Sequence, residues 1–499
     1  MKKNFFISFS LLATLFVSAQ QKNTLLEQSF WKTTPDVTAV QAEIAKGNNP
    51  SESNDRAFDP VVLAINNDAP NATIKFLLEQ AGNGVNKSTH DNRIYLHWAA
   101  AKGNLEIVEY LIAKGSNINL EDSHSSYPIT AAASSGQKNT AVYDALFKAG
   151  IDPKKKYQDG ANLLLMAIPY DKDLTLTNYF ISKGMSLKDI DNNGNTAFNY
   201  AARTGNIALL KTLLDKGIKY TDNALIIAAQ GNRRETNTLE TYKYLVEDLK
   251  IKPTATSKTG ETVLHFLANK PNQTEIINYF LAKGVDANKA DNEGNTPLMV
   301  AASAKETTAL EQLLPIVKNY NTQNEKGESA LTIAVKSGTP SAVELLLNKG
   351  ADVMVTDKEG NNLGAYLIQS YRPQMNRGPE GQKQDPFSTK IQLLQGKGLD
   401  LAAPQKDGNT LLHLAITKND LALLKKIADL KIDINLKNKD GLTALHKAAM
   451  ISKDDAILKY LLSIGAKKDI NTEFDESVYT LAKENESLSK NNVSIEFLK

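Results

Sequence analysis

The chain of 499 residues contains no cysteine. This absence excludes disulfide bonds, thiolate metal sites, cysteine nucleophiles and lipid attachment to an N-terminal cysteine. Packing and hydrogen bonding alone must therefore stabilise the fold. Because 41% of the residues are hydrophobic, the sequence has enough apolar material to build a core.

A surplus of charge of one sign is also missing. The sequence has 58 Lys and Arg residues against 56 Asp and Glu residues. Nucleic-acid-binding proteins normally carry a surplus of basic residues, which displaces counterions from the phosphates. We therefore expect no nucleic-acid partner.

Long hydrophobic runs are absent beyond the first residues of the chain. A membrane-spanning helix needs about 20 apolar residues, and no run of that length occurs, so we expect no membrane span. Residues 1–19 combine Lys2 and Lys3, an apolar stretch over 5–17 and small residues at 18–19. This order is typical of a secretory signal peptide. We expect export, first to the periplasm, with the cell surface or the medium as alternatives.

Catalytic motifs are missing as well. The sequence has no G-x-x-x-x-G-K-[ST] phosphate loop, no G-x-S-x-G nucleophile elbow and no H-E-x-x-H metal pair. These motifs carry nucleotide, acyl-transfer and zinc-protease chemistry respectively. We therefore predict that the protein is not an enzyme and needs no cofactor.

A short pattern recurs along nearly the whole chain. It is clearest in TPLMVA at 296–301, TLLHLA at 410–415 and TALHKA at 443–448. Most gaps between successive copies are within two residues of 33. The first position of the pattern, called the first slot below, falls at Asp59, Ile94, Tyr127, Asn162, Thr196, Asn223, Thr262, Thr296, Ser329, Asn362, Thr410 and Thr443.

Each copy predicts two short helices. In the second copy, Leu96, Ala99 and Ala100 begin one helix, Gly103 turns the chain, and residues 107–112 carry the apolar stripe of another helix. Small alanines allow the helices of neighbouring copies to approach closely. The second helix repeatedly ends in Lys-Gly, as at 114–115 and 283–284. Lysine suits the negative end of the helix dipole, and glycine adopts the left-handed conformation that follows a helix.

The period and the motif resemble those of ankyrin repeats. The resemblance implies an all-α solenoid of helix-turn-helix units joined by short β-hairpins or turns. It also implies a non-catalytic scaffold that binds a protein partner. We expect a signal peptide at 1–19, a capping or degenerate repeat at 20–58, about twelve repeats over 59–477 with an insertion near 370–390, and a capping helix at 478–499.

Four of the six histidines occupy one slot of the motif: His97, His265, His413 and His446. The resemblance implies that each forms a hydrogen bond with the backbone near the turn. A catalytic histidine would not recur once per repeat, so we interpret all four as structural.

Polar and aromatic residues that follow the small-residue slot of the motif are candidates for partner binding. Tyrosine and arginine are common anchors of interfaces because they combine contact area with directed hydrogen bonds. The candidates are Tyr170, Arg203, Arg233, Arg234, Lys270, Lys336, Tyr371, Arg372 and Lys418. Trp98 and Tyr366 lie one slot earlier, and we interpret them as packing residues.

A metal- or ligand-handling protein is the alternative. His90 and His124 fall at the turns of adjacent repeats beside Asp91 and Asp122, and stacking would bring the two turns together. Imidazole and carboxylate suit Zn²⁺. These four residues are therefore a candidate metal site, although ordinary exposed turn residues explain them as well. An enzyme with an unrecognised site is a weaker alternative. The sequence does not specify the partner or the oligomeric state.

Overall fold

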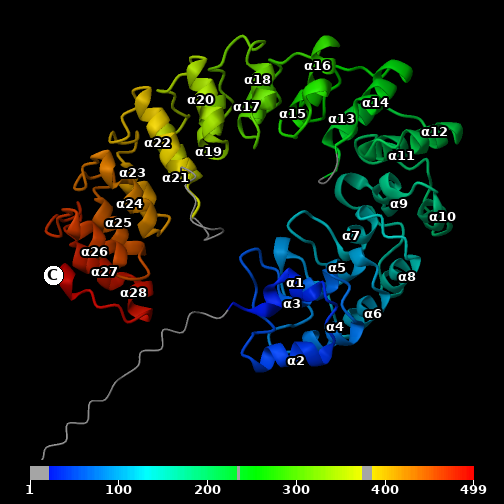
Figure 1. The fold of residues 1–499 in the computed structure, drawn as a ribbon, viewed down its shortest axis with the longest axis horizontal. Coiled ribbons are helices and arrows are strands. Elements are labelled where there is room, and N and C mark those ends of the chain that lie inside the picture. The colour runs from blue at the N-terminus through cyan, green and yellow to red at the C-terminus, as the bar shows by residue number, and fades with distance from the viewer. Residues whose placement is uncertain (1–21, 233–235, 374–384) are drawn as a thin grey trace, which may run out of the picture. The chain divides into compact units, whose positions relative to one another are not determined.

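The computed structural model describes residues 22–232, 236–373 and 385–499, so the expected signal peptide lies outside the described residues. The chain divides into two compact units, each described by itself. Unit 1 comprises residues up to Ala201 together with Ala208–Tyr220, and unit 2 comprises Ala202–Ile207 and Thr221–Lys499. Within each unit, pairs of short helices follow one another (Figure 1).

Unit 1 begins with a 3₁₀ turn at Thr24–Leu26 and the helices α1 (Gln28–Trp31) and α2 (Val37–Ala45). The first helices of its repeats are α3 (Pro60–Asn66), α5 (Tyr95–Lys102), α7 (Pro128–Ser134), α9 (Leu163–Ala167) and α11 (Ala197–Ala201). The second helices are α4 (Asn71–Leu78), α6 (Leu105–Ala113), α8 (Thr140–Lys148), α10 (Thr175–Ser182) and α12 (Ile207–Asp215).

Unit 2 repeats the arrangement. Its first helices are α13 (Asn223–Gln230), α15 (Val263–Leu267), α17 (Pro297–Ala302), α19 (Ala330–Ser337), α21 (Leu363–Ser370), α23 (Leu411–Ile416), α25 (Ala444–Ile451) and α27 (Val478–Glu484). The second helices are α14 (Leu239–Lys243), α16 (Thr274–Ala282), α18 (Thr308–Leu313), α20 (Pro340–Asn348), α22 (Pro386–Gly396), α24 (Leu421–Ile427), α26 (Ala456–Ser463) and α28 (Glu486–Lys490). None of these described helices has the length and apolar character needed to cross a bilayer.

The first slot of the motif marks the start of each first helix. In eleven of the twelve repeats the helix begins at the next residue, and the exception is Asn223, which is itself the first residue of α13. Side chains at this slot commonly accept a hydrogen bond from the backbone N–H three residues later, as Asp59 does from Val62 at 2.9 Å. Such a cap satisfies an N–H group that the helix itself leaves unpaired.

Like helices pack against like helices from one repeat to the next. In unit 2, α17 packs against α19 and α19 against α21, while α16 packs against α18. In unit 1, Ala99 and Ala100 of α5 and Ala132 of α7 are fully buried, as the small-residue prediction requires. Ile107 and Leu111 of α6 are fully buried too, and each such side chain contributes about 1.5–3 kcal/mol to stability.

Turns rather than strands connect the repeats. The described residues form three isolated antiparallel bridges, Thr256 with Thr262, Gln323 with Ser329 and Thr356 with Asn362.

The Lys-Gly pairs end the second helices, as predicted. Gly115, for example, follows α6 with φ 85°, in the left-handed region.

The C-terminal tail differs from the single capping helix that we expected. It forms α27 and α28, with Asn485 between them. The Asn485 side chain accepts hydrogen bonds from the N–H groups of Ser487 and Leu488, which starts a second helix. Its amide nitrogen also donates to the carbonyls of Ala449 and Ser452, which ties the tail to the preceding repeat.

Candidate functional site

One side chain from each of five consecutive first helices, α15 to α23, forms an apolar column in unit 2. These residues occupy the fourth position of the first helices, immediately before the small-residue slot. The column consists of Phe266, Val300, Ile333, Tyr366 and Leu414. All but Tyr366 are half-buried, and Tyr366 is 5% exposed. Because the core-facing positions of the same helices are buried, the four half-buried members of the column are apolar surface that these helices leave partly uncovered.

An open pocket of about 290 Å³ lies beside this column. Met299, Val300 and Ile333 contribute its apolar lining, and Glu261 and Asp291 contribute carboxylates. Glu261 accepts hydrogen bonds from the hydroxyls of Ser257 and Thr259, at 3.0 and 2.8 Å. Asp291 accepts from backbone N–H groups in its own turn. Neither carboxylate takes part in an ion pair among the described residues.

The turn before α19 contains a carboxylate, Glu328, that forms an ion pair with a lysine. Lys336 Nζ lies 2.9 Å from Glu328 Oε1 and sits 5.5 Å from the centre of the Tyr366 ring. Burial raises the pKa of Glu328, but the hydrogen bonds from Lys336 and Asn324 outweigh it, so the net pKa is lowered. Lys336 is therefore paired within its own chain, with 40% of its side chain exposed.

Two more candidate cations cap the end of α13. Lys270 Nζ donates to the carbonyls of Ala229 and Gln230, at 2.7 and 2.6 Å. Burial and the nearby Arg203 guanidinium lower the pKa of Lys270 to about 8. Arg203 itself donates to the Gly231 carbonyl at 3.1 Å. The slot after the first helix thus supplies donors for unpaired carbonyls of a neighbouring repeat, the preceding one for Lys270 and the following one for Arg203.

The remaining candidates differ in exposure. Tyr371 is 6% exposed, packs edge-on against Phe387 and lies 3.3 Å from Asp420 through its hydroxyl. Tyr170 is half-buried, whereas Arg372 and Lys418 are exposed. Arg233, Arg234 and residues 374–384 of the insertion lie outside the described residues.

The four motif histidines have the structural role that we expected. In each, Nδ1 accepts a hydrogen bond from the backbone N–H of the first-slot residue, as from Thr410 to His413 at 3.1 Å. Nε2 donates to a carbonyl of the next turn, as from His413 to Leu442 at 2.9 Å. Burial lowers the pKa of all four imidazoles, which keeps them neutral.

The metal candidates come together only in part. The Nε2 atoms of His90 and His124 lie 3.5 and 3.2 Å from Asp91 Oδ2, so stacking does join the two turns. Asp122 instead pairs with Arg93 at 2.8 Å. Across the described ranges, no group of three or more histidine and carboxylate side chains is arranged to hold a metal ion.

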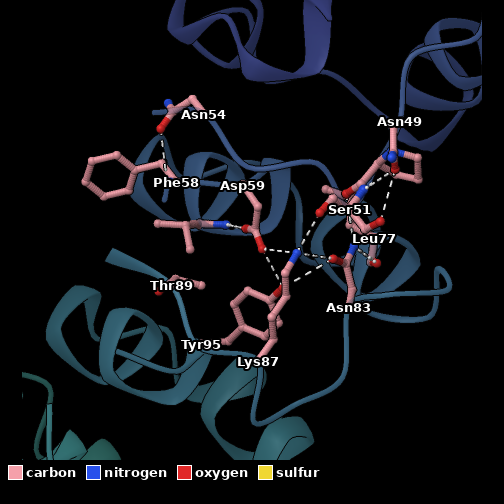
Figure 2. Close-up of polar contacts among 12 residues, drawn as sticks. Asn49, Ser51, Asn54, Phe58, Asp59, Leu77, Asn83, Lys87, Thr89 and Tyr95 are labelled. Atoms are coloured by element: carbon pink, nitrogen blue, oxygen red, sulfur yellow. Dashed lines mark hydrogen bonds and ion pairs between the residues drawn. The ribbon is translucent and has the colours of Figure 1, made fainter. Parts of the chain in front are cut away.

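Sequence reasoning missed a buried polar network near the start of unit 1. Figure 2 shows Lys87 and Tyr95 pointing toward the Asp59 carboxylate, at 2.8 and 2.6 Å. Asp59 and Tyr95 are fully buried, and Asn83 contacts both Lys87 and Tyr95. Burial, with the charge of Asp59, raises the pKa of Tyr95 far above its usual value. The network joins two repeats.

Trp98 is half-buried beside this network, and its indole N–H donates to Thr89. The Arg93 guanidinium lies 5.0 Å from the Trp98 ring. Tyr366 donates to Asp357 at 2.7 Å. Both aromatic residues are thus engaged in internal contacts, as we expected for packing residues.

Comparison with known proteins gives consistent matches to one family. The family model described as "Ankyrin repeats (3 copies)" matches residues 34–122, 129–224, 264–357 and 384–473. The chain is 26% identical to NF-kappa-B inhibitor delta of Mus musculus over 253 residues, which is 46% of this chain and 75% of the relative. It is 22% identical to transient receptor potential cation channel subfamily A member 1 of Homo sapiens, over 87% of this chain and 33% of the relative.

Among solved structures, the ankyrin repeat domain of Bcl-3 aligns with a TM-score of 0.36 and 19% identity. The alignment covers 47% of this chain and 100% of that domain.

Proposed function

The chain belongs to the ankyrin repeat family, and from that premise we propose that it binds a protein partner through the first helices of unit 2 without catalysing a reaction. The repeats of this family are generally scaffolds for protein–protein interaction. The observation that carries the proposal is the apolar column, which presents a half-buried side chain from each of four repeats, Phe266, Val300, Ile333 and Leu414, beside an open pocket.

The column favours a partner that contributes apolar side chains. A preformed row of side chains on packed helices loses little conformational entropy on association. Apolar contact area of this kind is worth about 25 cal/mol per Å² buried. The carboxylates of Glu261 and Asp291, which pair with no cation among the described residues, add a preference for a basic side chain among the apolar ones.

The signal-like residues 1–19 support a further part of the proposal, that the protein acts after export. The scaffold would then capture its partner in the cell envelope or the medium. Arg372 and Lys418 are exposed and stay predicted contributors to the interface, as do Arg233 and Arg234.

The test is affinity capture from the envelope fraction of the producing cell, read by quantitative mass spectrometry. The column variant Phe266→Ser, Ile333→Ser removes two large apolar side chains from the face. The matched control Ile316→Ser, Ile464→Ser changes isoleucines that are 46% and 40% exposed elsewhere. We expect a stoichiometric partner that the wild type and the control retain and the column variant loses by at least about tenfold. Equal capture by all three proteins would contradict the proposal.

A further inference from the structure

The pocket of about 290 Å³ beside the apolar column has two carboxylates in its lining and no lysine or arginine among its described lining residues. Glu261 lies in the turn before α15, and Asp291 lies in the turn before α17. The Asn292 N–H donates to the Thr259 carbonyl at 2.8 Å, which joins the two turns. Figure 1 shows α15 and α17 next to each other. Two negative charges thus share one opening.

The two acids occupy positions that are in contact at other junctions. Glu261 is the residue before its first slot, and Asp291 lies five residues before the next first slot. At two other junctions the side-chain amides at these positions bond to each other, at 2.9 and 3.0 Å, in the pairs Asn295–Asn324 and Asn409–Asn438. The repeat therefore places these two positions side by side, and at the pocket both carry a carboxylate.

Unit 1 has an arginine at the same pair of positions. Arg93 occupies the position of Glu261, and its Nε donates to Asp122 Oδ2 at 2.8 Å. The guanidinium also lies 5.0 Å from the Trp98 ring. The position of Trp98 is held at the pocket by Phe266, so the aromatic ring and the aspartate are both present there without the arginine.

Asp291 has the hydrogen-bond pattern of Asp122. In Asp122, Oδ1 accepts from two backbone N–H groups of its own turn, which leaves Oδ2 for Arg93. Asp291 Oδ1 likewise accepts from two backbone N–H groups, at 2.9 and 2.8 Å. Its Oδ2 accepts one bond from the Asn295 amide at 3.1 Å, and a carboxylate oxygen can accept a second. In Glu261, Oε2 takes both hydroxyl bonds, and Oε1 accepts none from the described part of the chain.

One other junction carries two acids at these positions, and there the chain supplies its own cation. The acids are Glu328 and Asp357. Lys336 Nζ lies 2.9 Å from Glu328 Oε1, and the Tyr366 hydroxyl donates to Asp357 at 2.7 Å. Lys336 lies seven residues after its first slot, and the corresponding residue at the pocket is the uncharged Asn269. The carboxylates of the pocket therefore lack the neutralisation that their counterparts have.

The imidazole in the pocket does not replace that cation. His265 Nε2 donates to the Asn295 carbonyl at 3.0 Å, and Nδ1 accepts from the Thr262 N–H at 3.0 Å. Burial lowers the pKa of His265, and the hydrogen bond to Asn295 and the charges of Asp291 and Glu261 oppose this effect only in part. The imidazole is therefore neutral near pH 7, and a neutralising cation must come from another molecule.

Arginine fits this pocket better than lysine does. A guanidinium has five N–H donors in one plane and can bond to both carboxylates, whereas an ammonium group is a compact point charge. The aliphatic part of an arginine can lie against Val300 and Ile333, which line the same pocket.

We propose that this pocket binds an arginine side chain of the protein partner. The arginine would take the place that Arg93 fills at its own junction. This inference rests on the proposed scaffold function, because it names one residue that the partner supplies beside the apolar side chains that contact the column.

The test is saturation-transfer NMR on the full chain with acetyl-Leu-Arg-Leu-amide and with the same peptide carrying citrulline or lysine in place of arginine. Citrulline keeps the shape of arginine and replaces the guanidinium by a neutral urea. We expect the arginine peptide to bind at least about tenfold more tightly than the citrulline peptide and at least about threefold more tightly than the lysine peptide. Equal binding of the arginine peptide and either of the others, or binding of none, would overturn the proposal.

Two variants locate the site. Glu261→Gln removes one charge, and amides occupy this position natively at Asn295, Asn361 and Asn409, so the turn should fold. Glu261→Arg copies the Arg93 arrangement and supplies the guanidinium from within the chain. We expect the arginine peptide to bind about fivefold more weakly to Glu261→Gln and at least about tenfold more weakly to Glu261→Arg.

The matched control is Glu275→Gln, a change at an exposed glutamate of α16, which should leave the affinity for the arginine peptide unchanged. Circular dichroism checks that each variant is folded. Unchanged binding to either folded Glu261 variant, or an equal loss in the control, would refute the assignment.

The capture experiment separates this inference from the proposed function. Glu261→Gln should lower capture of the partner at least about fivefold. Loss of the partner in the column variant with full capture by Glu261→Gln would overturn the arginine site and leave the scaffold function standing. Binding of the arginine peptide that depends on Glu261, with full capture by the column variant, would support the arginine site and contradict the role of the column.

Discussion

A buried lysine in unit 2 makes the stability of α22 depend on pH in a predictable way. Lys390 is 4% exposed, and its ammonium group donates to the Val335 carbonyl at 2.7 Å. Burial, together with the nearby Arg372 guanidinium, lowers its pKa from 10.5 to about 8. The charged form is therefore less stable in the folded chain than in the unfolded chain.

The size of the penalty follows from the shift. At about 1.4 kcal/mol per pKa unit, the ammonium costs about 3 kcal/mol of stability at pH 7. In Lys390→Met this cost disappears, while the lost hydrogen bond leaves the Val335 carbonyl unpaired at a cost of about 1–2 kcal/mol. We therefore expect the variant to be more stable than the wild type by about 1–2 kcal/mol at pH 7.

The free energy of unfolding of the wild type rises with pH as this lysine titrates. For a lysine stabilised by an ordinary ion pair it would fall. Between about pH 8 and pH 10.5 the unfolded chain binds more protons at this lysine than the folded chain, so wild-type stability rises with pH. The advantage of Lys390→Met should shrink by about 1 kcal/mol between pH 7 and pH 9.

Hydrogen exchange of peptides from α22, read by mass spectrometry at both pH values, measures this local stability. Lys397→Met, a change at an exposed lysine beyond the same helix, should alter it by less than about 0.5 kcal/mol. A destabilised Lys390→Met variant, or an advantage equal at pH 7 and pH 9, would refute the reasoning.

Two other predictions concern buried polar groups. Asp59→Ala leaves Lys87 and Tyr95 without their carboxylate partner. This change should destabilise the start of unit 1 by about 3–5 kcal/mol, measured by chemical denaturation followed through tryptophan fluorescence. A loss of stability under about 1 kcal/mol would contradict the prediction. Folding lowers the pKa of the four motif histidines, so these imidazoles are protonated more easily in the unfolded chain than in the folded chain. Stability should therefore fall as pH drops below about 6.5. His413→Thr, which copies the native Thr130 arrangement, should reduce the difference in melting temperature between pH 7 and pH 5.5, and an unchanged difference would count against this explanation.

The repeat architecture could be predicted from sequence because its signals are local and recur. The first slot starts the first helix and the Lys-Gly pair ends the second helix, each through residues within one or two turns. The small residues recur at one position of the motif, where neighbouring helices pack. The role of the motif histidines was predictable through the resemblance to ankyrin repeats, since both of their hydrogen bonds go to backbone groups, one at the first slot and one in the next turn.

The side chains proposed for binding were harder to place, because their directions depend on contacts with the preceding repeat, with the preceding turn or with residues beyond the insertion. Lys270 reaches back to the carbonyls of Ala229 and Gln230, and Lys336 pairs with Glu328 in the turn before its own helix. Tyr371 is buried against Phe387 from the far side of the insertion. None of these contacts follows from the spacing of the motif.

At the fourth helical position, Tyr366 was interpreted as a packing residue, and its 5% exposure and its hydrogen bond to Asp357 agree with that interpretation. Comparing the fourth helical position across repeats would have found Phe266, Val300 and Ile333 as well. The Asp59 network, in contrast, combines residues from a helix cap and an adjacent loop, and no repeated pattern predicts their contact.

The central claim, that the first helices of unit 2 bind a protein partner, is tested most directly by titration calorimetry with the captured partner. The dissociation constant should rise at least about tenfold in Phe266→Ser, Ile333→Ser and stay within about twofold of wild type in Ile316→Ser, Ile464→Ser. Equal constants for all three proteins, or a loss confined to the control, would contradict the claim.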